Sequence, residues 1–373
     1  MPRRGENIHK RKDGRWEGRY IDRYKPGGQA HYKSVYARSY AEVKIKLIKA
    51  KAVPNTQRQL TSLVSMGQLS LLWLDDKKIQ IKESSYARYY QVIHGHILPY
   101  FKGAEASRIS NSMVNQFVKD KLSHGRIDGT GGLSNKSVSD ILTILLQIIQ
   151  CGEKKQYILK FDYDINRPKR EYTEPAILSQ SEQDKLLQYA KANLDHKKLG
   201  VLLALYTGVR LGELCALTWN DIDFTTGTLH ITKTLQRIKD TDPNSSKKTK
   251  MVITPPKSQK SIREIPLPAF LLCTLEKFRR QCEIYILSGT SKYIDPRAYQ
   301  DKFKQYLKGA GVEAVSFHAL RHTFATRAIE NNFDYKSLSE LLGHSTVRFT
   351  MERYVHSSRE IKRANMEKFA VCF

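Results

Sequence analysis

The sequence is poor in cysteine, in acidic residues and in long apolar runs. Five cysteines are spread over 373 residues without a Cys-x-x-Cys pair, so we expect reduced intracellular thiols and neither a disulfide framework nor a metal site. No apolar run is long enough to span a bilayer, and the first residues, Met1–Gly5, lack the apolar segment of a signal peptide. A cytoplasmic protein without a membrane partner is the resulting expectation.

The shortage of acidic residues leaves a large positive charge. The chain holds 63 Lys and Arg against 37 Asp and Glu, a formal net charge of +26 with a pI of about 9.7. Solubility alone needs no excess of this size, so the charge indicates a polyanionic partner, most often nucleic acid. With 40% hydrophobic residues the chain can bury two or three cores, which excludes disorder as its main state.

The first 55 residues predict a small basic domain. Residues 1–52 hold 15 Lys and Arg against 5 Asp and Glu. Asp-Gly and Pro-Gly-Gly turns separate segments rich in aromatic residues, which is typical of antiparallel strands. We expect three strands and a helix that begins after Ser39, at residues 8–12, 15–24, 31–36 and 40–52. The sheet face opposite the helix is predicted to bind DNA through Arg15, Arg19 and Lys33, with a merely solvated face as the alternative.

Residues 60–165 predict an all-helical domain. Apolar residues recur there at helical spacing, and Ser84-Ser85 and Ser134 precede two of the segments as caps. The predicted helices are residues 69–78, 84–94, 112–122 and 134–150. Several basic and hydroxyl side chains are candidate phosphate contacts, although helix caps and surface charge explain them equally well; they are Lys82, Ser85, Tyr86, Arg88 and Lys136.

A glycine-rich segment, Gly125–Gly132, invites comparison with a phosphate-binding loop. Such a loop follows a strand and precedes Lys-Ser or Lys-Thr, and the sequence has neither feature here. A flexible connection between two helices is the better prediction.

Residues 172–373 predict a mainly helical domain with a β-hairpin insertion at 228–267. His318 and Arg321 are three residues apart, so on a helix they share a face and could grip one phosphate. Such a pair alone is more often a solvated helix face. Arg210 follows a Thr-Gly break, and we expect it at a helix start, where an anion is favoured.

The order of the motifs resembles that of the tyrosine recombinases, the lambda-integrase family. The shared elements are an arginine in Thr-Gly-x-Arg-x-x-Glu-Leu, a hairpin lysine, His-x-Leu-Arg-His-Thr, Leu-Gly-His-Ser and a terminal Arg-Tyr, over residues 175–360. The N-terminal segments resemble the arm-binding and core-binding domains of conjugative-transposon and prophage integrases. The resemblance implies a multidomain α+β chain with an arm-type domain at 1–55, a helical core-binding domain at 60–165 and a catalytic domain at 172–373.

The resemblance assigns roles that the chemistry supports independently. Tyr354 would attack a DNA phosphorus to give a 3′-phosphotyrosyl bond and a free 5′-hydroxyl. Arg210 and Arg321 would clamp the non-bridging oxygens, and His344 would donate a hydrogen bond to the phosphate. No metal or other cofactor is implied.

Proton transfer has competing candidates. Lys257 would protonate the leaving 5′ oxygen, with Lys260 on the same turn as its competitor, and His318 would act as general base or proton relay. His322 is expected to be a supporting residue that points away from the face of His318. Tyr335 is the alternative nucleophile, but we expect it to pack at the start of an apolar helix.

The resemblance also implies partners and two rival functions. The partners would be double-stranded DNA at core and arm sites, three further copies in a tetramer, an excisionase and a host DNA-bending protein, in the nucleoid of a bacterium. One rival is a type IB topoisomerase, against which the basic N-terminal domain argues. The other is a DNA-binding regulator without catalytic activity, which the intact set of motifs disfavours.

Overall fold

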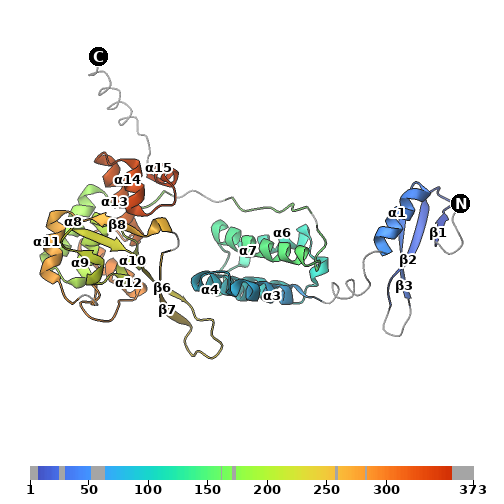
Figure 1. Cartoon of the computed structure of the whole chain (residues 1–373), viewed down its shortest axis with the longest axis horizontal. Helices are drawn as coiled ribbons and strands as arrows, with labels where there is room; N and C mark the ends of the chain where they lie inside the picture. The colour runs from blue at the N-terminus through green and yellow to red at the C-terminus, as the bar shows by residue number, and fades with distance from the viewer. Residues whose placement is uncertain are drawn as a thin grey trace, which may run out of the picture. The chain divides into compact units, whose positions relative to one another are not determined.

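The computed structural model describes residues 7–24, 30–51, 64–160, 162–169, 174–256, 259–281 and 284–354. Contacts divide the chain into two compact units, Met1–Glu171 and Tyr172–Phe373. As predicted, the chain is multidomain and mixes helices with strands, with a three-stranded sheet near its N-terminus (Figure 1). The finer division into three domains stays a prediction. No helix in these ranges is long and apolar enough to cross a membrane.

The N-terminal sheet is antiparallel, and a helix covers one of its faces. Its elements are β1 (Ile8–Lys10), β2 (Trp16–Tyr24), β3 (Ala30–Ala37) and α1 (Tyr40–Lys51). Val43 and Leu47 of α1 are buried against the sheet. Gly18 of β2 lies beneath them, and an added Cβ there would come within 3.0 Å of Val43 Cγ1, so glycine permits the close approach. Ser39 Oγ accepts a hydrogen bond from the Glu42 amide at 3.2 Å, which confirms the predicted cap.

The next helices enclose a core of their own. They are α3 (Met66–Lys78), α4 (Glu83–Val92), a π-helical turn (Ile93–Ile97), α5 (Leu98–Phe101), α6 (Asn111–His124) and α7 (Asn135–Lys154). Leu142, Leu145 and Ile149 recur at helical spacing on α7 and are fully buried in this core. Ser134 caps α7, as predicted, and the glycine-rich segment Gly125–Gly132 links α6 to α7, as predicted.

One predicted cap is wrong. Helix α4 begins at Glu83, so Ser84 and Ser85 lie inside its first turn. The N-cap position belongs to Lys82, whose side chain makes no capping hydrogen bond. An acidic residue in the first turn favours this start through the helix dipole, which the serine pattern did not take into account.

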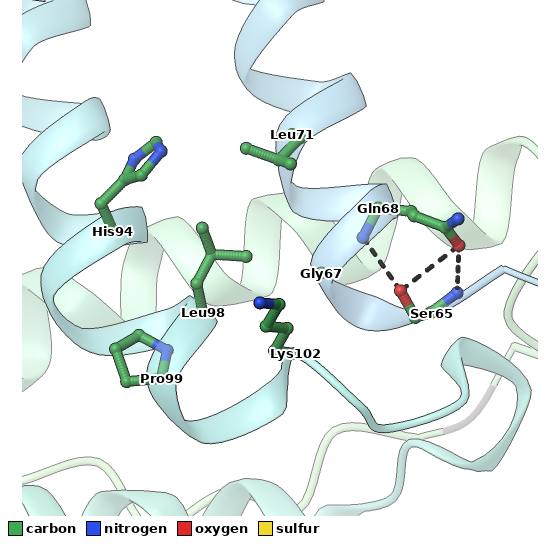
Figure 2. Close-up of a pocket in the computed structure, with 8 residues that line it drawn as sticks. All are labelled: Ser65, Gly67, Gln68, Leu71, His94, Leu98, Pro99 and Lys102. Carbon is green, nitrogen blue, oxygen red and sulfur yellow. Dashed lines mark hydrogen bonds between the residues drawn. The ribbon is translucent and has the colours of Figure 1, made fainter.

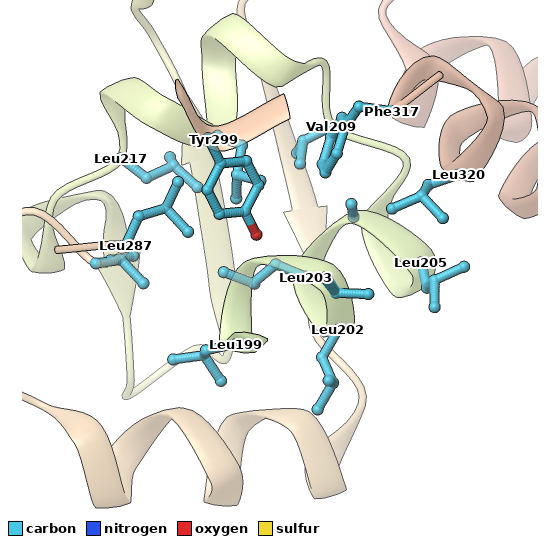
Figure 3. Close-up of a cluster of buried hydrophobic side chains, with 14 of the residues drawn as sticks. Leu199, Leu202, Leu203, Leu205, Val209, Leu217, Leu287, Tyr299, Phe317 and Leu320 are labelled. Carbon is cyan, nitrogen blue, oxygen red and sulfur yellow. The ribbon is translucent and has the colours of Figure 1, made fainter. Parts of the chain in front are cut away.

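The second unit is built around the buried helix α9 (His196–Thr207), which is apolar on most sides. Leu199, Leu202 and Leu203 of α9 pack in a cluster that also includes Tyr299 and Phe317 (Figure 3). Ser179 caps the preceding helix, α8 (Gln180–Ala192). The other helices are α10 (Leu211–Ala216), α11 (Ala269–Phe278), α12 (Pro296–Gly309), α13 (His318–Glu330), α14 (Tyr335–Leu342) and α15 (Val347–Tyr354).

The β insertion is present, but its pairing differs from the prediction. Its strands are β4 (Ile222–Asp223), β5 (Thr228–Ile231), β6 (Thr234–Lys239), β7 (Thr249–Thr254) and β8 (Arg263–Pro266). Strand β6 pairs with β7 as a hairpin, whereas β8 pairs with β5 in a separate sheet of order β4-β5-β8. Strands β7 and β8 therefore belong to two different sheets and do not form a hairpin with each other. Burial of Arg263 and Ile265 beside β5 accounts for the pairing of β8 with β5.

Candidate active site

Three segments far apart in the sequence meet in the second unit. Helix α9 ends at Gly208, whose left-handed φ of 63° turns the chain, and Arg210 takes the N-cap position of α10. An added Cβ at Gly208 would lie 2.5 Å from Phe324 Cδ1 on α13, so glycine permits this contact. Helix α14 likewise ends at Gly343, with φ 62°, and His344 follows it. Arg210 Nη2 donates to Gly343 O at 3.3 Å, which joins the two turns directly.

A buried carboxylate holds Arg210 in place. Arg210 Nη1 donates to Glu213 Oε1 at 2.8 Å, and the Arg210 amide donates to Glu213 Oε2 at 2.9 Å. Arg263 donates to the same carboxylate from Nη1 at 3.1 Å and from Nη2 at 2.9 Å. Burial acts to raise the pKa of Glu213, but the hydrogen bonds and charges of Arg263 and Arg210 outweigh it and lower the pKa to about 2. Glu213 is therefore an ionised support for two guanidinium groups.

Arg263 is absent from the residues predicted from the sequence. Its side chain shares the buried, inward face of β8 with Ile265. Its Nε donates to Leu341 O at 2.6 Å, which ties β8 to the end of α14. The signal was present in the sequence, because an arginine at an inward-facing strand position requires a buried acceptor.

Arg321 is the most deeply placed cation of the site. It is 2% exposed, and its guanidinium donates to Gly208 O at 2.7 Å and to Leu342 O at 2.5 Å. Burial, followed by the positive charges of Arg210 and Arg263, lowers the pKa of Arg321 to about 9. A guanidinium stays protonated at neutral pH even so, and the lowered pKa indicates a pocket with excess positive charge that an anion would stabilise.

His344 lies beside this cluster as a neutral imidazole. Burial, followed by the charges of Arg321 and Arg210, lowers the pKa of His344 to about 3. His344 Nδ1 is 2.8 Å from Thr350 Oγ1, and its ring is nearly parallel to that of Tyr354, with 6.2 Å between centroids. When Nδ1 accepts from the threonine hydroxyl, Nε2 carries the ring proton and can donate to a bound anion.

Tyr354 closes the site from α15. Its side chain is 7% exposed and packs against Ala325, Leu338 and Leu342 of α13 and α14. Its hydroxyl is 2.8 Å from His322 Nδ1. His322, expected to be a supporting residue, therefore contacts the tyrosine hydroxyl itself.

His318 begins α13 with an exposed side chain. Its ring meets that of His322 edge to face, with 4.5 Å between centroids. The two residues are four apart on one helix and therefore neighbours on the same face, contrary to the prediction. The predicted shared face of His318 and Arg321 is present, but the guanidinium of Arg321 is buried whereas His318 is open to solvent.

Of the two candidate lysines, the structure describes Lys260 and not Lys257. Lys257 lies outside the described residues. Lys260 is exposed, and its Nζ donates to Ser345 O at 2.9 Å, next to His344. The competing candidate is therefore at the site, beside the loop that follows α14.

The alternative tyrosine, Tyr335, is the first residue of α14. It lies at the start of the helix, as expected, but its side chain is 38% exposed and is not one of the helix's buried residues. Leu338 and Leu342 form the buried face of this short helix instead.

The open face of the N-terminal sheet holds two of its three predicted DNA-binding residues. The Arg19 guanidinium lies over the Tyr32 ring, 5.7 Å from its centroid, and the Arg15 guanidinium lies over the Tyr36 ring at 5.8 Å. Lys33 pairs with Tyr20, which packs toward α1, so Lys33 belongs to the helix-covered face. Its assignment to the open face is wrong, because residues directly opposite each other project to the same side.

The predicted contacts of the helical domain fall on α4 and α7. Arg88 donates to Asp140 Oδ2 at 2.8 Å, and Lys136 is one helical turn before Asp140 on α7. Tyr86 is partly buried against the helical core, and burial raises its pKa. Ser85 lies in the first turn of α4. The structure thus brings Arg88 and Lys136 to neighbouring helix faces.

A pocket of about 670 Å³ lies in the first unit, between α3 and α5 (Figure 2). Ser65 and Gln68 on its wall are tied to each other by the capping box of α3. Its lining residues are Ser65, Gly67, Gln68, Leu71, His94, Leu98, Pro99 and Lys102. It contains no residue of the arginine, histidine and tyrosine cluster, which belongs to the second unit.

Comparison with known families places two matches on the chain. Residues 176–360 match the phage integrase family, and residues 65–122 match the phage integrase N-terminal SAM-like domain. The chain is 27% identical over 318 residues to a XerC-like tyrosine recombinase of Caldanaerobacter subterraneus and 26% identical over 316 residues to the ICEBs1 integrase of Bacillus subtilis. Each alignment covers 79% of this chain and 79% of the relative.

Solved structures share the fold at lower identity. The Tn1549 transposon integrase in complex with a circular intermediate DNA matches with a TM-score of 0.64 and 20% identity, over 82% of this chain and 99% of that one. A lambda integrase tetramer bound to a Holliday junction matches with a TM-score of 0.57 and 19% identity, over 96% of this chain and 99% of that one.

Proposed function

Because the chain belongs to the phage integrase family of tyrosine recombinases, we propose that it is a site-specific DNA recombinase that integrates and excises a mobile genetic element. It cleaves and rejoins DNA strands through a 3′-phosphotyrosyl intermediate and a Holliday junction. The observation that carries the proposal is the buried hydroxyl of Tyr354 beside a cluster of guanidinium groups in one unit. The phosphotyrosyl bond conserves the energy of the broken phosphodiester, so the exchange requires no ATP.

The cationic residues of the site bind and polarise the phosphate. Arg210 and Arg321 contact its non-bridging oxygens, and neutral His344 donates a hydrogen bond to it. These groups are fixed before DNA arrives by Glu213 and by backbone carbonyls, which lowers the reorganisation required as negative charge develops in the transition state. Removing one such donor typically reduces the rate by about 10²–10³-fold.

Tyr354 is the nucleophile. An ordinary phenol has a pKa near 10 and is a weak nucleophile at neutral pH, which is why the site combines cations with bases. Lys257 protonates the leaving 5′ oxygen, with Lys260 as the alternative, and His318 serves as base or proton relay. Since Tyr354 packs on α13 and α14 of its own chain, each protomer supplies its own nucleophile.

The partners follow from the same function. Four protomers assemble on two DNA duplexes, and the helical domain holds the core site through Arg88 and Lys136. The N-terminal sheet holds separate arm sites through Arg15 and Arg19. An excisionase and a host DNA-bending protein set the direction of the exchange.

A plasmid assay tests the function against its rival. A supercoiled plasmid with two copies of the DNA that flanks this gene should yield two recombined circles with the wild type. A matched plasmid without these copies should stay supercoiled. Relaxation of the second plasmid, with no recombined product from the first, would instead support a topoisomerase.

A further inference from the structure

The hydroxyl of Tyr354 and the imidazole of His322 form a buried pair. His322 is 6% exposed on α13, Tyr354 is 7% exposed on α15, and Nδ1 and Oη are 2.8 Å apart. None of the roles described above uses this contact. It brings an imidazole directly to the atom that must lose a proton.

The geometry of the pair meets the requirement for proton transfer. A general base must be within about 2.6–3.2 Å of the group that it deprotonates, and His322 Nδ1 is at that distance. His344 is a poor base, because its pKa is lowered to about 3 and its Nδ1 is engaged with Thr350. The groups around the pair are His318 on α13, Arg321 on α13 and His344 after α14.

We propose that His322 is the catalytic residue that accepts the phenolic proton of Tyr354, an inference that rests on the proposed recombinase function. The Oη–H bond breaks and the proton moves to His322 Nδ1 while Oη forms its bond to phosphorus. The bond from phosphorus to the 5′ oxygen breaks, and that oxygen takes a proton from the site's lysine. In rejoining, the 5′-hydroxyl returns its proton to the lysine as its oxygen attacks phosphorus, and Oη leaves and recovers its proton from His322.

His318 has a complementary position. Its ring contacts that of His322 and its side chain is open to solvent. It can therefore carry the proton of the His322 imidazolium toward solvent. In this role His318 acts through His322 and does not act on Tyr354 directly. We expect a smaller loss of rate from His318→Asn than from His322→Asn.

The test measures single-turnover cleavage of a nicked duplex from the flanks of this gene by full-length protein. In His322→Asn the amide occupies the position of Nδ1 and keeps a hydrogen bond but cannot accept a proton. Cleavage should slow by about 10²–10⁴-fold with DNA affinity unchanged. The rate of the variant should continue to rise with pH toward the phenol pKa near 10, whereas that of the wild type should level off at a lower pH.

Two further measurements separate proton transfer from a structural role. Imidazole added to His322→Ala should restore cleavage in proportion to its free-base concentration. A substrate with sulfur in place of the bridging 5′ oxygen, whose thiolate leaves without protonation, should not rescue His322→Asn. The matched control is His230→Asn, a half-buried histidine of β5, which should cleave like the wild type.

Each outcome decides the inference. Wild-type rates and pH dependence in His322→Asn would overturn it, as would faster cleavage, which would mean that the contact restrains the tyrosine. Rescue of His322→Asn by the sulfur substrate would also overturn it. If the wild type and Tyr354→Phe behave alike, the recombinase function itself fails, and the inference fails with it.

Discussion

Both terminal nitrogens of Arg263 donate to the carboxylate of Glu213, at 3.1 Å and 2.9 Å, inside the core of the second unit. The same carboxylate holds Arg210. Arg210, which we propose to be catalytic, is therefore positioned by a buried ion pair between Glu213 and Arg263, and Arg263 was not predicted from the sequence. Removing one partner of such a pair leaves an uncompensated charge.

We expect Arg263→Met to destabilise the protein by about 3 kcal/mol. It should also slow DNA cleavage, because Glu213 would lose its pair with Arg263 and would attract the guanidinium of Arg210 more strongly, shifting that group within the site. Arg263→Lys keeps the charge but not the two parallel donors, so it should recover part of the rate. Lys304→Met, which breaks an exposed pair with Asp301 on α12, is the control and should have little effect. Urea unfolding and single-turnover cleavage measure both effects. Equal rates for Arg263→Met and Lys304→Met would show that Arg263 does not position Arg210.

The lowered pKa of Glu213 predicts acid sensitivity of the second unit. A carboxyl whose pKa is about 2 when folded and 4.5 when unfolded contributes stability above pH 4.5, and that stability is lost as the pH falls from 4.5 toward 2. The contribution at neutral pH is on the order of 3 kcal/mol. Fluorescence of Trp219, in a background with Trp16→Phe and Trp73→Phe, would follow the second unit. Glu213→Gln should be less stable at pH 7, and its free energy of unfolding should fall less between pH 4.5 and 2 than that of the wild type. An equal fall in both proteins would refute the assignment.

An anion should stabilise the free protein. Burial lowers the pKa of Arg321, and the positive charges of Arg210 and Arg263 add to this effect, so an anion bound beside the three guanidinium groups would be stabilised. Inorganic phosphate at ten times its Kd should add about 1.4 kcal/mol of stability. Thermal unfolding in phosphate, with sodium chloride at equal ionic strength as the reference, measures this. The effect should disappear in Arg210→Gln, and its persistence there would place the anion elsewhere.

The identity of the leaving-group acid can be settled with two lysine variants. We expect Lys257→Ala to slow cleavage strongly with little loss of binding, and Lys260→Ala to slow it less, because Lys260 is engaged with Ser345 O. Sulfur in place of the bridging 5′ oxygen removes the need for a proton, so it should rescue the variant that lacks the acid. Rescue of Lys260→Ala and not of Lys257→Ala would reverse the assignment.

The local pattern of the sequence was sufficient to predict most helices and strands of the fold. Strand alternation, turn dipeptides and caps such as Ser39 and Ser134 predicted the N-terminal sheet and several helices, because these signals act within a few residues. It was harder to predict which face of the N-terminal sheet each side chain occupies. The placement of Lys33 depends on register with Tyr20 across β2 and β3, which a single strand does not encode.

The parts of the site that escaped prediction are long-range contacts. Arg263 meets Glu213 across 50 residues, and His322 meets Tyr354 across 32 residues. Motifs brought Arg210, Arg321 and His344 to attention because their neighbours in sequence are distinctive. Which side chain finally touches Tyr354 depends on how α15 packs on α13, and that packing is decided by the whole unit.

The most direct test of the account is the mapping of a covalent protein–DNA adduct. Nicked duplex DNA from the flanks of this gene would be incubated with the full-length protein, and the adduct that resists SDS would be located by peptide mass. The account predicts a phosphotyrosyl linkage on Tyr354 that is absent from Tyr354→Phe, with DNA binding preserved. An adduct of unchanged yield in Tyr354→Phe, or a linkage mapped to Tyr335, would contradict it.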